Sequence, residues 1–165
     1  GGPNLDRLAD GGDPNAYMLP MPHPAGRYDY SFSGLKTAFI NLVHGLRQRG
    51  DPYREADLAA VFRDTVVRHL CDAAIRACLD YGFRTLALAG GVSANSLLRR
   101  LLAERCADEG IACYLPPLHL SGDNAAMVAS AAYFQLKKGD VAGLDLNADP
   151  SLALKYAAED QPVDF

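Results

Sequence analysis

The stretch TLALAGGVSANSLLRRLLAERCADEGIACYL, from Thr85 to Leu115, decides the fold of this chain of 165 residues. It opens with the short apolar run Thr85–Ala89, which predicts a buried strand that the pair Gly90–Gly91 ends. A helix is predicted next, from about Ser93 to Ala107, and a second apolar run, Ile111–Leu115, predicts another strand. The order strand, helix, strand indicates an α/β fold with parallel strands and right-handed crossovers.

The sequence before this stretch predicts a loop-rich connection over residues 1–30, with one short helix around Asn4–Ala9. The segment YDYSF, Tyr28–Phe32, alternates aromatic and polar residues and therefore predicts a strand. A helix is expected from Leu35 to about Gln48. A longer one is expected over Asp57–Tyr81, because apolar residues recur there at helical spacing on one face.

Alternating charges mark the other face of that long helix. Five charged residues follow one another at steps of four, and this ladder predicts a solvated face supported by pairs between successive turns. Its members are Asp64, Arg68, Asp72, Arg76 and Asp80. A further helix is predicted over Ala125–Lys138, so the α/β part should span residues 31–142 and a loose acidic tail residues 143–165.

Composition indicates an ordinary globular protein, with 49% hydrophobic and 22% charged residues. The formal net charge of -4 gives no overall attraction for nucleic acid, so an RNA partner would need local basic patches or surfaces outside the chain. The four cysteines lie in apolar segments without C-x-x-C spacing, which favours reduced, packed thiols in a cytoplasmic protein. No apolar run is long enough to predict a membrane span. The chain opens on Gly-Gly-Pro rather than Met, so we expect a fragment.

The turn LAGGVSAN, residues 88–95, is the strongest candidate binding site. Open parallel sheets bind ligands where their strands end, and glycines let the backbone approach a nucleotide whose phosphate a helix start favours. Asn95 can both donate and accept hydrogen bonds there. An alternative stays open, namely a tight turn capped by Ser93 with no ligand.

Four ordered segments resemble the TsaD-type tRNA N6-adenosine threonylcarbamoyltransferases. The longest is LAGGVSANSLLRRLL, residues 88–102, and the others are GGP (1–3), SFSGLKTA (31–38) and DNAAMVA (123–129). The chain departs from the pattern of bacterial members in reading Ser121–Gly122 where they most often have Cys-Thr. This departure leaves the conformation of the loop before Asp123 open.

The resemblance implies roles for particular residues. Those expected to contact an adenylate are Gly2, Gly90, Gly91 and Asn95. Asp123 is expected to bind one divalent metal ion, iron or zinc, although on its own it would suggest only a helix cap. The other ligands in the family are two histidines of an H-x-x-x-H helix, which are expected outside this chain, since its four histidines lack that spacing. Ser33 and Lys36 are expected near the cleft or the tRNA side, with a helix cap and a plain exposed lysine as alternatives. Arg99 and Arg100 are weaker candidates for contacting nucleic acid.

The resemblance also implies an actin-like ATPase fold, of which this fragment would supply mainly the second lobe. The implied reaction transfers the threonylcarbamoyl group from threonylcarbamoyl-AMP to N6 of the adenosine beside the tRNA anticodon. TsaB-type and TsaE-type helper proteins would be partners, and the fragment alone would be inactive. Two alternatives stay open: another carbamoyltransferase of the same superfamily, and a non-catalytic paralogue that serves as an interaction partner.

Overall fold

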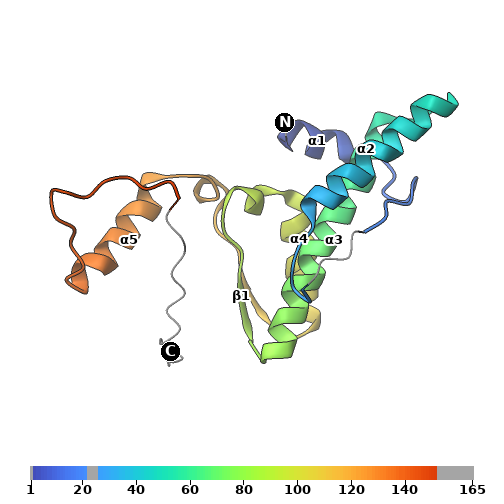
Figure 1. The fold of residues 1–165 in the computed structure, drawn as a ribbon. Helices are drawn as coiled ribbons and strands as arrows, with labels where there is room; N and C mark the ends of the chain where they lie inside the picture. The colour runs from blue at the N-terminus through green and yellow to red at the C-terminus, as the bar shows by residue number, and fades with distance from the viewer. Residues whose placement is uncertain (1, 22–25, 152–165) are drawn as a thin grey trace. The chain divides into compact units, whose positions relative to one another are not determined.

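The computed structural model describes residues 2–21 and 26–151, which fall into two compact units, Gly1–Asn124 and Ala125–Phe165 (Figure 1). The first unit is an α/β assembly and the second contains one helix. In chain order the elements of the first unit are α1 (Gly2–Ala9), α2 (Phe32–Arg49), α3 (Glu55–Tyr81), β1 (Thr85–Ala87), the 3-10 turn η1 (Gly91–Ala94), α4 (Ser96–Asp108), β2 (Ala112–Tyr114) and η2 (Leu118–Leu120).

The two strands are parallel, as the sequence predicts. Leu86 of β1 lies opposite Cys113 of β2, and the pairing extends one residue to each side. Each strand is shorter than its apolar run, because the residues that follow leave the ladder: Gly90 turns the chain after β1, and Pro116 cannot donate a ladder hydrogen bond after β2. The α/β architecture with parallel strands is therefore confirmed.

Helix α3 is the centre of the first unit, and three hydrophobic clusters form along it. Near its start Ala59 and Ala60 pack against Ala9 of α1, and Val61 packs against Leu35 of α2. Further along, α3 meets α4 in the largest cluster, whose buried members are Val67, Cys71, Ile75, Cys78, Leu98, Leu102, Cys106 and Ile111. The buried surface of α3 is therefore wider than the single apolar face that the sequence predicts, because different elements cover different sides of α3 along its length.

The strand predicted over Tyr28–Phe32 is wrong, since this segment has no ladder and α2 already begins at Phe32. Its aromatic side chains make contacts with one another and with α3 instead. The Tyr28 hydroxyl donates to Asp80 at 2.7 Å, and the Tyr30 ring stacks on Phe32 and meets His69 edge-on. The alternating pattern thus reflects the packing of aromatic side chains on a helix. Periodicity alone cannot distinguish such a segment from a strand.

The predicted charge ladder of α3 forms only in part. Arg68 and Asp64 make the expected pair at 2.6 Å. Asp72 pairs instead with Arg105 of α4, and Asp80 pairs with Arg27 at 2.8 Å. The Tyr28 hydroxyl and then Arg27 hold the pKa of Asp80 below its usual value. Much of this face therefore connects α3 to its neighbours.

All four cysteines are free, and Cys71, Cys78 and Cys106 are buried in the cluster between α3 and α4. Burial raises the pKa of Cys71 to about 11 and that of Cys106 to about 12, in the second case with help from Cys113. These thiols are therefore protonated at neutral pH and act as small apolar side chains, as the sequence predicts.

The second unit contains α5 (Ala125–Lys137), one residue shorter than predicted. None of its residues is buried, although the helix is rich in apolar side chains. Tyr133 meets Phe134 edge-on, and the Lys137 ammonium lies 4.9 Å from the centre of the Tyr133 ring. The predicted tail is described only as far as Ser151. Across the described ranges, no helix combines the length and the apolar character that crossing a bilayer requires.

Candidate functional site

The turn after β1 has a backbone that requires glycine at one position. Gly90 adopts φ 83° and ψ 172°, a region that side-chain-bearing residues avoid. The turn η1 follows, and α4 begins at Ser96 rather than near Ser93. Asn95 caps α4, since its Oδ1 accepts from the Leu98 amide at 2.9 Å. The predicted Ser93 cap is therefore wrong. Ser93 is completely buried, and its hydroxyl has no hydrogen-bond partner among the described residues.

A pocket of about 380 Å³ lies where α1 meets this turn. Its walls bring together three of the predicted adenylate contacts: Gly2 from α1, Gly91 from η1, and Asn95. Gly90 shapes the turn without lining the pocket. The remaining lining residues are Pro3, Asp6, Val92 and Ala94. Gly2 begins a helix here instead of ending a loop, and Gly1 lies outside the described residues.

Asp6 is the residue of this pocket that sequence analysis missed. Its Oδ1 accepts from Asn95 Nδ2 at 2.8 Å and from Arg63 Nη1 at 3.0 Å. The sequence analysis placed the start of this helix near Asn4. Because α1 begins at Gly2, Asp6 lies one turn after Gly2 on the same helical face, and this spacing is the signal that could have identified Asp6. The pKa of Arg63 is raised, because hydrogen bonds and charges of Asp10 and Asp6 outweigh burial, which alone would lower it.

Arg99 holds the turn after β1 and the loop after β2 together. Its Nη1 donates to the Ser93 carbonyl at 3.0 Å, and its Nη2 donates to the Pro116 carbonyl at 2.9 Å. The guanidinium is half-buried and engaged with the backbone, which disfavours the predicted contact with nucleic acid. Arg100, the next residue, is exposed and pairs with Glu104 at 3.2 Å.

Asp123 lies in the loop after η2, and its side chain is exposed. Asn124 holds this loop through a hydrogen bond from its Nδ2 to the Gly122 carbonyl at 2.8 Å. Asp123 does not line the pocket beside Asn95. Within residues 2–21 and 26–151, no three His, Cys, Asp or Glu side chains gather closely enough to hold a metal ion. The described residues therefore do not form a metal centre by themselves, since such a site needs several ligands.

Ser33 and Lys36 lie in the first turns of α2, and both are exposed. The residue at the N-cap is Ser31, so the alternative that Ser33 caps the helix is wrong. The Ser33 carbonyl accepts from the Thr37 hydroxyl at 3.0 Å. Neither residue lines the pocket beside Asn95, and their placement near a cleft stays a prediction.

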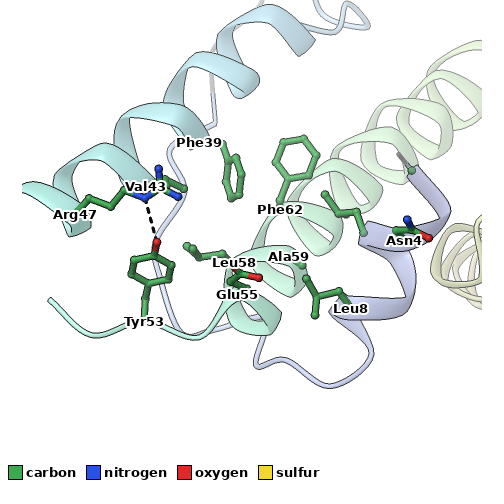
Figure 2. A pocket seen from close by; sticks show the side chains of 12 residues that line it. Asn4, Leu8, Phe39, Val43, Arg47, Tyr53, Glu55, Leu58, Ala59 and Phe62 are labelled. Atoms are coloured by element: carbon green, nitrogen blue, oxygen red, sulfur yellow. Dashed lines mark hydrogen bonds between the residues drawn. The ribbon is translucent and has the colours of Figure 1, made fainter. Parts of the chain in front are cut away.

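A second pocket, of about 590 Å³, lies between α1, α2 and α3 (Figure 2). Its walls are mostly apolar, and the rings of Phe39 and Phe62 meet across it with centroids 4.9 Å apart. At one end Arg47 Nε donates to the Tyr53 hydroxyl at 3.1 Å. Gly2 is the only predicted site residue in its lining. The pocket beside Asn95 is therefore the one on which the sequence predictions converge.

The fold is that of an α/β protein with a pocket at the strand-to-helix turn of a parallel sheet. A family model described as "TsaD: tRNA N6-adenosine threonylcarbamoyltransferase" matches residues 1–130. The chain belongs to this family.

Curated relatives agree with the family assignment. A tRNA N6-adenosine threonylcarbamoyltransferase of Caldicellulosiruptor bescii is 45% identical over 154 residues, which cover 93% of this chain and 46% of the relative. Proteins of the same name from Fusobacterium nucleatum and Acaryochloris marina are 45% and 43% identical, and the matches cover 92% and 98% of this chain. The chain spans about half the length of these relatives, at 46% and 47% of the latter two.

Proposed function

We propose that this chain contributes the adenylate side of a site that transfers a threonylcarbamoyl group from threonylcarbamoyl-AMP to N6 of the adenosine beside the anticodon in tRNA. The observation that carries the proposal is the pocket beside Asn95. Residues from α1 and from the turn after β1, far apart in the sequence, meet around one space of about 380 Å³. The relatives bear the name of this activity.

Open space around two glycines supports ligand binding over a turn that serves folding alone. A Cβ added at Gly2 or Gly91 would meet no atom within 4 Å, and neither glycine has a positive φ. Nothing in the described fold therefore requires glycine at these positions. A ligand that approaches the backbone closely would require it. Gly90 differs, since its backbone conformation alone accounts for the glycine.

Asn95 is suited to orient such a ligand. Its carbonyl oxygen accepts from the Leu98 amide and its amide nitrogen donates to Asp6. An amide nitrogen carries two protons and an amide oxygen two lone pairs, so one donor and one acceptor site remain for a ligand in the pocket. The existing bonds fix the rotation of the amide and hence where these sites point.

Asp123 would provide one ligand of a divalent metal ion, iron or zinc, whose other ligands come from outside this chain. Its carboxylate is exposed and therefore available, and oxygen ligands are acceptable to either metal. We derive no catalytic step from the metal, because the described residues do not complete its coordination.

The larger context follows from the family resemblance. The chain would form mainly the second lobe of an actin-like ATPase fold and would act in the cytoplasm with TsaB-type and TsaE-type helpers. Ser33 and Lys36 would lie toward the tRNA, where an exposed ammonium can bind phosphate. The net charge of -4 implies that binding of tRNA depends on such local contacts.

The test uses a joined protein, in which this chain is fused to the part of a family member's sequence that it does not span. Threonylcarbamoyl transfer to tRNA is measured with this joined protein. Asn95→Ala and Asp123→Ala should each lower kcat/KM at least about 100-fold, because each misplaces a reacting group. Asp123→Ala should also lower the amount of bound metal, whereas Glu104→Ala, an exposed control on α4, should change neither quantity. Unchanged transfer in both site variants would refute the assignment, and transfer to a small molecule or thiol but not to tRNA would favour another carbamoyltransferase.

A further inference from the structure

Arg63 of α3 is joined to the candidate pocket without lining it. Its Nη1 lies 3.0 Å from Asp6 Oδ1, 2.8 Å from the Asp6 carbonyl oxygen and 2.6 Å from Asp10 Oδ1. One nitrogen with two protons thus serves three acceptors, all on or just after α1. The Arg63 side chain is only 14% exposed and that of Asp6 27%, so solvent screens the contact between these two residues weakly.

A second set of hydrogen bonds continues from Asp6 to the turn after β1. The same Asp6 oxygen accepts from Asn95 Nδ2 at 2.8 Å, and Asn95 Oδ1 accepts from the Leu98 amide at 2.9 Å. Asp6 and Asn95 both line the pocket. The path from Arg63 through Asp6 to Asn95 therefore connects α3, α1 and the start of α4, three elements separated in the chain.

Charge gives Arg63 a role in this path beyond geometry. A carboxylate in the pocket wall would repel an anionic ligand such as an adenylate, and a cation hydrogen-bonded to it offsets that field. The cation also fixes Asp6 in the position from which it holds the Asn95 amide. Without Arg63, Asp6 would be free to rotate toward solvent, and the Asn95 amide would lose the partner that sets its orientation.

We propose that Arg63 is a positioning residue, which acts through Asp6 to hold Asn95 for an adenylate in the pocket. The proposal rests on the proposed function, since it concerns the same ligand. It adds a residue on α3 that does not touch the ligand and whose removal acts by way of Asn95.

The test measures binding of AMP and of threonylcarbamoyl-AMP by calorimetry in the joined protein described above, together with KM and kcat for transfer. Arg63→Met should weaken binding and raise KM about 10-fold with a smaller change in kcat, because it disturbs ligand positioning. Arg63→Lys should restore most of the affinity, since an ammonium offers three protons to the three acceptors. Arg68→Met, which removes an exposed pair on the same helix, is the matched control and should leave binding unchanged.

A double-mutant cycle separates positioning from a general loss of stability. In an Asn95→Ala background, Arg63→Met should weaken binding clearly less than in the unmodified protein, because positioning through Asn95 is gone and only the charge compensation of Asp6 remains. Equal effects of Arg63→Met with and without Asn95, or no effect on binding, would overturn the proposal. If Arg63→Met does not fold, Arg63→Gln carries the same test, since it keeps a hydrogen-bond donor on α3 but removes the charge that holds Asp6.

The two proposals fail in distinguishable ways. Absence of adenylate binding in the unmodified protein would refute the proposed function. Binding that Asn95→Ala weakens but that Arg63→Met and Arg63→Gln leave intact would refute only the role of Arg63.

Discussion

The turn after β1 and the loop after β2 stand at the same end of the sheet, yet they are held in different ways. The turn receives side chains from several helices: Asp6 of α1 bonds Asn95, and Arg99 of α4 bonds the Ser93 carbonyl. Besides the Arg99 contact, the loop contains short-range bonds such as that from Asn124 Nδ2 to the Gly122 carbonyl. In the part of the chain that the structure describes, no hydrogen bond or ion pair orients Asp123. This chain therefore preorganises the proposed adenylate side and leaves the proposed metal side open.

Removal of Arg99, whose side chain contacts both the turn and the loop, should have the largest effect on stability. Arg99→Met leaves two carbonyl oxygens without their charged donor and should lower the free energy of unfolding by about 3 kcal/mol, given the usual strength of such bonds. Arg100→Met, one residue along, should change it by less than about 0.5 kcal/mol, since it removes only an exposed pair. Urea unfolding followed by circular dichroism measures both. Equal effects would show that Arg99 does not join the two segments.

A glycine pair tests whether the turn is fixed by its backbone. Gly90→Ala should cost about 2 kcal/mol, because alanine is strained at φ 83°. Gly91→Ala should be nearly neutral for stability, since its φ is not positive and a Cβ there meets open space. Both variants are compared by urea unfolding, and adenylate binding is measured in parallel. If Gly91→Ala lost as much stability as Gly90→Ala, the positive φ of Gly90 would not be what fixes the turn.

Substitutions of two buried serines, one in each segment, should have the smallest effects on stability, and only that of Ser93 should be stabilising. Ser93→Ala should raise stability by about 1 kcal/mol, because it removes a buried hydroxyl without a partner among the described residues. Ser121→Ala should leave stability unchanged or slightly lower, because its hydroxyl reaches the Pro117 carbonyl at 3.5 Å. Thermal unfolding of both variants measures the difference. A loss of stability in Ser93→Ala would mean that its hydroxyl has a partner beyond those described.

Much of the fold was predictable because its signals are local. Helical spacing identified α3, and two apolar runs separated by a helix identified the parallel strands. The segment Tyr28–Phe32 was wrongly predicted as a strand, because its aromatic residues pack on a helix. The pattern within the segment does not reveal where that helix lies. The limits of the α/β part and of the tail stay predictions.

The candidate site was predictable only where residues belong to one segment. Gly91 and Asn95 follow from the turn motif, and their meeting with Gly2 agrees with the family resemblance. Asp6 and Arg63 could not be found in the same way, because their importance comes from contacts between α1, α3 and the turn. The roles of the site residues, Asp123 included, stay predictions until ligand and metal binding are measured.

The short length of α1 makes the pocket sensitive to local unfolding. An isolated helix of eight residues is not stable in water, so α1 depends on docking through Ala9 and the Arg63 ion pairs. Undocking would remove Gly2, Pro3 and Asp6 from the pocket while leaving the cluster between α3 and α4 in place. Amide hydrogen exchange should therefore be faster in α1 than in α4. The affinity for a ligand would therefore be proportional to the fraction of molecules in which α1 is docked. The pocket exists only in that fraction, so its population is set by the docking equilibrium of one short helix.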